Sequence, residues 1–134
     1  MDLIAYCGGL PEGTGKVVSG GPMMGRAMAG LDVPVVKGMS AVLVIPDESA
    51  RRQSEQLCVR CGKCVSACPM GLEPYLLSKM VRKAMWNGAE AHNITDCIEC
   101  GSCSWTCLSA LPLLDYIRVG KAEVMRRIRA RKGR

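Results

Sequence analysis

Eight of the nine cysteines in this chain fall into two copies of one spacing pattern. Each copy places three cysteines two residues apart and adds a fourth after three more residues. The first run contains Cys58, Cys61, Cys64 and Cys68, and the second contains Cys97, Cys100, Cys103 and Cys107. Such runs are typical of thiolate ligands to 4Fe–4S clusters. The pattern therefore predicts two clusters and a role in one-electron transfer.

The four cysteines of a run need not bind the same cluster. A 4Fe–4S cube takes one thiolate at each of four irons, and three closely spaced cysteines can reach three of them from one loop. Gly62 and Gly101 occupy equivalent places and help each loop to close. Where two clusters are bound, the fourth cysteine of each run ligates the other cluster. We therefore expect cluster I on Cys58, Cys61, Cys64 and Cys107, and cluster II on Cys97, Cys100, Cys103 and Cys68.

Two other uses of eight cysteines remain open on spacing alone. Zinc binds four thiolates, and eight could hold two ions, but such sites usually pair two separated knuckles. A disulfide scaffold needs an oxidising compartment, to which nothing in the sequence points. Leu108 stands where proline usually follows the fourth cysteine, whereas Pro69 has that place in the first run. We expect leucine at this position to alter the local backbone geometry of the second run but not the ligation of its cluster.

The length and charge of the chain restrict what else it does. Its 134 residues make one domain or two small ones, and a 49% hydrophobic composition supports a packed core. The net charge of +6 is local, since residues 118–134 carry eight basic side chains against one acidic. Such a basic segment suits nucleic acid, lipid headgroups, an acidic partner or simply a solvated helix end. No aromatic residue follows Val119, so base stacking has no platform and we expect no nucleic acid partner.

The apolar segments are too short to predict a membrane span. The longest run, Ala41–Ile45, falls far below the length that crosses a bilayer, and the N-terminus lacks the pattern of a signal peptide. We expect a protein that is soluble or peripheral to a membrane.

The first 50 residues are rich in glycine and β-branched residues, which predicts strands over Lys16–Ser19, Val33–Val36 and Ala41–Ile45. A polar stretch from Pro46 to Glu55 predicts a linker or short helix. The lone Cys7 is expected to be buried as a small apolar residue.

An internal repeat covers the cysteine region. A shift of 39 residues superimposes all four cysteines and both loop glycines. A helix is predicted after each run, one from Pro74 to a stop at Asn87-Gly88 and one beginning after Pro112. Long helices after each run favour an α-helical ferredoxin domain over the small β-rich type. Trp105, inside the second run, could shield cluster II from water or simply pack in the core.

Several segments together resemble a known family. Gly20–Gly25, Leu31–Lys37 and Asp96–Gly101, combined with both cysteine runs, are similar to the C-terminal part of the C subunit of the Rnf electron-transport complex, a ferredoxin:NAD oxidoreductase coupled to ion transport. The similarity covers roughly residues 1–123. It implies an α+β chain: a partial β-grasp domain of the soluble-ligand-binding type over 1–50, an α-helical two-cluster ferredoxin domain over 51–120, and a basic helix end or tail over 121–134.

The resemblance also implies partners and a location. The chain would be peripheral, on the cytoplasmic side of the cell membrane, among other subunits of a membrane redox complex. Ferredoxin or a flavin/NADH module would be its redox partner. The flavin and NADH site of the family lies upstream, so this chain is expected to be a fragment or short product that does not oxidise NADH alone. A cobalamin-reductase-like iron–sulfur subunit and a non-enzymatic metal-binding module remain the alternatives.

Overall fold

The chain is described here by a computed structural model that covers residues 2–133. Two compact units follow one another: the first ends at Gln53 and the second begins at Ser54. Helices combine with one small antiparallel sheet, which agrees with the predicted α+β class.

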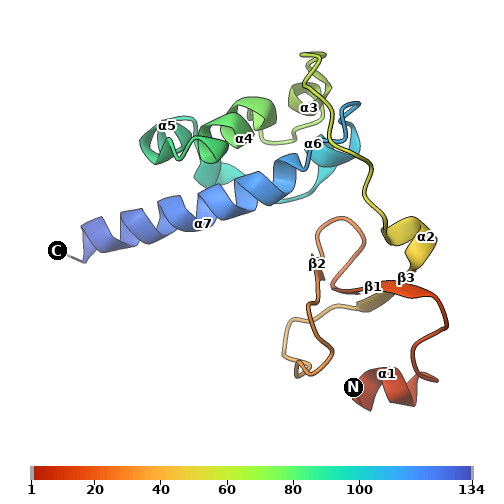
Figure 1. The fold of residues 1–134 in the computed structure, drawn as a ribbon. Helices are drawn as coiled ribbons and strands as arrows, with labels where there is room; N and C mark the ends of the chain where they lie inside the picture. The colour runs from red at the N-terminus through yellow and green to blue at the C-terminus, as the bar shows by residue number, and fades with distance from the viewer. Residues whose placement is uncertain (1, 134) are drawn as a thin grey trace. The chain divides into compact units, whose positions relative to one another are not determined.

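The first unit is built on a three-stranded antiparallel sheet with the order β2-β1-β3. Its strands are β1 (Thr14–Ser19), β2 (Arg26–Ala27) and β3 (Val42–Pro46), preceded by α1 (Asp2–Tyr6) and followed by α2 (Asp47–Ala50), as Figure 1 shows. Val17 pairs with Val44 and Val18 with Leu43, which buries both β1 valines. Two of the three predicted strands are thus confirmed, with ends shifted by one or two residues.

The third predicted strand, Val33–Val36, is wrong. This segment forms no strand, and Val33, Val35 and Val36 are all exposed. Pro34 has no amide hydrogen to donate to a neighbouring strand. β-branched residues favour strands because they pack on a half-buried pleated surface, and these valines have no such surface within the first unit.

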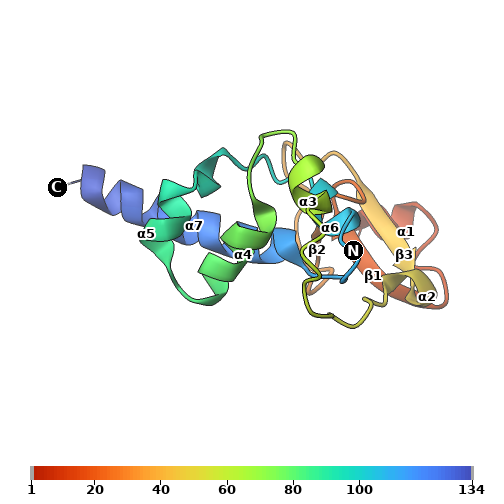
Figure 2. The same ribbon diagram turned by 90° about the horizontal axis from the view of Figure 1, so that it is seen from above.

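The second unit consists of helices and loops. Its elements are α3 (Lys63–Ser66), α4 (Pro74–Arg82), α5 (Trp86–Ala91), the 3₁₀ helix η1 (Ile94–Asp96), α6 (Ser102–Trp105) and α7 (Leu113–Lys132). Helix α4 lies along α7 in two perpendicular views (Figure 1, Figure 2). Fully buried side chains join α4, η1 and α7 in one core: Leu77, Ile94, Leu113, Ile117 and Val124.

The first predicted helix ends earlier than its sequence indicates. Helix α4 stops at Arg82, because Ala84 takes a left-handed conformation with a φ of 53°. The amides of Ala84 and Met85 donate back to Val81 O and Met80 O, each at 2.9 Å, which is a Schellman cap built without glycine. The predicted stop at Asn87-Gly88 is therefore wrong, and both residues lie inside α5.

Helix α7 confirms the second predicted helix and extends it to Lys132, through the basic segment. Gly120 permits its close contact with α4 and η1, since a Cβ there would overlap Val81 Cγ2 and lie 2.8 Å from Ile94 Cδ1. Across residues 2–133, no helix is both long and apolar enough to span a membrane.

Candidate functional site

The two cysteine runs form matched loop–helix units. Gly62 and Gly101 both adopt left-handed conformations, with φ values of 77° and 86°, and each begins a four-residue helix, α3 or α6. The residues two positions earlier, Arg60 and Glu99, are also left-handed, with φ values of 53° and 58°. The repeat seen in the sequence is therefore a repeat of backbone conformation, and it gives both runs the same turn.

The structure places Cys68 of the first run among cysteines of the second. A cavity of about 350 Å³, including the open space at its mouth, is lined by Cys68 together with Cys97, Cys100 and Cys103. The remaining wall is largely apolar and includes Leu72, Ile98, Leu114 and Ile117. Burial raises the pKa of Cys97, and the nearby Cys68 contributes in the same direction. These are the four cysteines predicted to hold cluster II.

The first run approaches Cys107 in a corresponding way. Helices α3 and α6 are in contact. Ser109 Oγ donates to Leu57 O at 2.9 Å, and Gln56 N donates to Ser109 O at the same distance, which joins the segments next to Cys58 and Cys107. Burial raises the pKa of Cys64, and Cys107 adds to this through its negative charge. Cys58 and Cys61, from the same run, are exposed.

The environment of the second-run thiols differs from one to the next. Burial raises the pKa of Cys103 to about 11. Hydrogen bonding to Ser102 lowers the pKa of Cys100. A cysteine binds a metal as its thiolate, so metal binding removes the proton from the thiol. The buried Cys103 therefore stays protonated at neutral pH unless a bound cation compensates its loss of hydration.

The donor set fits an iron–sulfur cube. Soft thiolates select zinc, copper(I) or iron–sulfur clusters. Within residues 2–133, no three Cys, His, Asp or Glu side chains are grouped closely enough to hold a single ion. A cube carries its four thiolates on four separate irons, so cysteines spread around an apolar hollow suit it.

Helix α7 supports the second loop through contacts that sequence reasoning missed. Ser104 Oγ accepts a hydrogen bond from Leu114 N at 2.9 Å, which satisfies an amide in the first turn of α7. Lys121 Nζ donates to Cys97 O at 2.6 Å, and Arg118 Nε lies 3.0 Å from Glu99 Oε2. Because 10 to 24 residues separate the partners, no local spacing predicts these contacts.

Two expectations about single side chains are wrong. Trp105 is 82% exposed, so it does not pack in the core. It ends the short helix α6, whose inward face is taken by Cys103. Cys7 is exposed rather than buried, since it follows α1, a helix with no buried residue.

Comparison with known proteins agrees with this chemistry. Residues 50–108, which include both runs, match the family described as "4Fe-4S dicluster domain". That part of the chain is thus similar to iron–sulfur domains.

Curated relatives extend the match to most of the chain. The C subunit of the Na⁺-translocating ferredoxin:NAD⁺ oxidoreductase complex of Acetobacterium woodii is 43% identical over 125 residues, covering 93% of this chain and 28% of the relative. The corresponding subunit of the proton-translocating complex of Clostridium ljungdahlii is 44% identical, covering 91% and 27%. The C subunit of an ion-translocating oxidoreductase complex of Yersinia enterocolitica is 42% identical, covering 92% and 18%. The predicted resemblance is confirmed, and the chain spans less than a third of the length of each of these relatives.

Proposed function

Since the chain is homologous to a segment of the C subunits of ion-translocating ferredoxin:NAD⁺ oxidoreductases, we propose that it transfers electrons through two 4Fe–4S clusters in such a complex. The observation that carries this proposal is the cavity in which Cys68 meets three cysteines of the other run. When bound, each cluster supplies a centre that accepts and releases one electron.

The proposed ligands follow the crossed arrangement. Cluster I takes Cys58, Cys61, Cys64 and Cys107, and cluster II takes Cys97, Cys100, Cys103 and Cys68. Contact of α3 with α6 and the Ser109–Leu57 hydrogen bond support the first set. The shared cavity supports the second. Exchange of the fourth ligand would hold the two centres close together, which suits electron passage from one to the other.

The partners and location are proposed from the relatives. We infer that the chain works with other subunits of a membrane redox complex, with ferredoxin or a flavin/NADH module as its redox partner and without nucleic acid. Its place would be peripheral, on the cytoplasmic side of the membrane. Residues 1–50 would be part of a β-grasp domain, residues 51–120 the ferredoxin domain and residues 121–134 a basic end. The three-stranded sheet supports the first assignment.

Metal analysis tests the proposal directly. The chain is purified without oxygen, and its iron, acid-labile sulfide and zinc are measured beside its visible spectrum. We expect about eight iron and eight sulfide per chain, with a broad absorption band that dithionite bleaches. Two zinc ions in a colourless protein would contradict electron transfer and indicate a structural metal module.

A further inference from the structure

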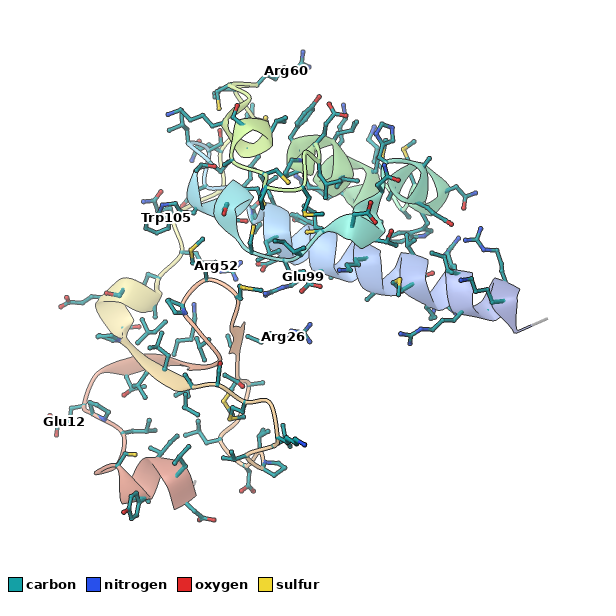
Figure 3. The ribbon with its side chains drawn as sticks, turned by 180° about the vertical axis from the view of Figure 1, so that it is seen from behind. Glu12, Arg26, Arg52, Arg60, Glu99 and Trp105 are labelled. Carbon is teal, nitrogen blue, oxygen red and sulfur yellow. The ribbon has the colours of Figure 1, made fainter. Side chains whose placement is uncertain are left out.

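The two ligand loops carry opposite charges at equivalent positions. Arg60 and Glu99 correspond under the 39-residue repeat and share the left-handed backbone conformation. Figure 3 shows Arg60 at an outer tip of the second unit, pointing away from the ribbon. Glu99 instead lies beside α7, where its side chain is 25% exposed. The repeat therefore gives one loop a solvated cation and the other a half-buried anion.

Two cations of α7 meet Glu99 and the loop that contains it. Arg118 Nε is 3.0 Å from Glu99 Oε2, and Lys121 Nζ is 3.7 Å from Glu99 Oε1. Lys121 also donates to the carbonyl of Cys97 at 2.6 Å. The side chains of Arg118 and Lys121 are 19% and 24% exposed, so solvent screens them only in part.

The left-handed turn directs a donor at a ligand atom. Glu99 N lies 3.4 Å from Cys97 Sγ, within hydrogen-bonding range for sulfur. The conformation is unfavourable for a residue with a side chain, and the contacts of Glu99 with α7 stabilise it. Hydrogen bonds to ligand sulfurs, net charge and solvent exposure are the means by which a protein sets a cluster potential. This loop contains all three: a hydrogen bond to Cys97 Sγ, a group of charged side chains, and partial exposure to solvent.

We propose that Glu99 is a positioning residue that, with Arg118 and Lys121, sets the reduction potential of cluster II and makes it differ from that of cluster I. This inference rests on the proposed two-cluster function. Reduction adds negative charge to a cluster, so a neighbouring cation favours the reduced state and a neighbouring anion opposes it. The carboxylate of Glu99 offsets the two cations that it holds over the loop.

The charges make opposite predictions for different substitutions. Glu99→Gln removes the anion but keeps the size of the side chain, so the potential of cluster II should rise. Lys121→Met and Arg118→Gln each remove a cation, so the potential should fall. Lys121→Arg keeps the charge and should stay near the parent value. A purely structural role would move Glu99→Gln and Lys121→Met in the same direction, through loosening of the loop.

The experiment is a redox titration of the whole chain with its clusters loaded. Electron paramagnetic resonance monitors the reduced clusters at each potential. The cluster II signal is identified by its absence from Cys100→Ala. We expect the ratio of reduced to oxidised cluster II at a fixed potential to change on the order of tenfold, or about 59 mV for one electron. The matched control is Glu123→Gln, because Glu123 also binds two arginines of α7, Arg126 and Arg127. It should leave cluster II unchanged.

Different outcomes would contradict the role of Glu99 and the proposed two-cluster function. A parent chain without iron would remove the proposed function itself. A loaded chain in which Glu99→Gln and Lys121→Met shift cluster II in the same direction, or not at all, would overturn the inference alone. If Glu99→Gln loses cluster II, the other two variants test the inference. Arg118→Gln removes a cation and should lower the potential of cluster II, whereas Lys121→Arg keeps the cation and should leave that potential unchanged.

Discussion

Single cysteines can test the proposed crossed arrangement of ligands, and Cys68 is the most informative of them. It belongs by sequence to the first run but lines a cavity with Cys97, Cys100 and Cys103. Cys107 has the reciprocal position: it belongs to the second run but lies near Cys64 of the first, whose pKa it helps to raise. A ligand set that followed the sequence would instead keep each run on its own cluster, so substitution can distinguish the two arrangements.

We predict that Cys68→Ala removes the same cluster as Cys100→Ala, although the two residues lie in different runs. Cys107→Ala should likewise match Cys61→Ala. Each variant should retain about four iron of the expected eight, because one cube loses a ligand and the other keeps its full set. Iron analysis and electron paramagnetic resonance of the remaining cluster make the comparison.

Cys7→Ala is the control for these substitutions, since Cys7 lies in the first unit and outside both runs. It should leave the iron content unchanged. If the cluster that survives in Cys68→Ala is the one that survives in Cys97→Ala and Cys100→Ala, the crossing holds. If it is instead the cluster that survives in Cys61→Ala, each run keeps its own cluster.

Among the helices, the contact of α7 with α4 and η1 depends on a missing side chain. We predict that Gly120→Ala destabilises the second unit by ~1–3 kcal/mol, because the new methyl group would overlap Val81 and press on Ile94. The midpoint of unfolding in urea, followed by circular dichroism without oxygen, measures the effect. Gly88→Ala in α5 is the control: its nearest neighbour is the flexible Met80 side chain at 3.5 Å, so this change should be neutral or stabilising.

The turn between α4 and α5 contains a second backbone feature with a measurable cost. Ala84 is exposed and left-handed, so glycine at this position would relieve strain without loss of packing. We predict that Ala84→Gly stabilises the protein by ~0.5–1 kcal/mol. The same substitution at Ala122, an exposed residue inside α7, should destabilise by a similar amount. Equal losses at both positions in urea unfolding would contradict the account of the cap.

The elements show which features a sequence can predict. Cysteine spacing and the 39-residue shift predicted the matched loops, and the apolar face through Leu113, Ile117 and Val124 predicted α7. The end of α4 could not be foreseen, because Ala84 stands where glycine normally marks a cap. The strand over Val33–Val36 failed because composition does not reveal whether a partner strand lies beside it. The contacts of Glu99 were missed because they join residues far apart along the chain, although the repeat does set Glu99 opposite Arg60.

At the scale of the whole molecule, the second unit is stabilised differently at its two ends. Its apolar core joins α4, η1 and α7, where five side chains are fully buried. Residues 54–71, which include the entire first run, contain no buried residue. Burial of apolar surface can therefore hold the helices, whereas the first loop would depend on hydrogen bonds and on the proposed cluster.

We predict that removal of iron separates these two ends in hydrogen exchange. After chelation, amides of residues 54–71 should exchange rapidly, since the bound centres no longer order this segment. Amides of α4 and of Leu113–Val124 should keep most of their protection, because the largest fully buried side chains beneath them are aliphatic and none is a cysteine. Mass spectrometry of peptides from loaded and chelated protein measures both regions in one sample. Complete exchange throughout α4 and α7 would mean that the clusters, and not the apolar core, hold the second unit together.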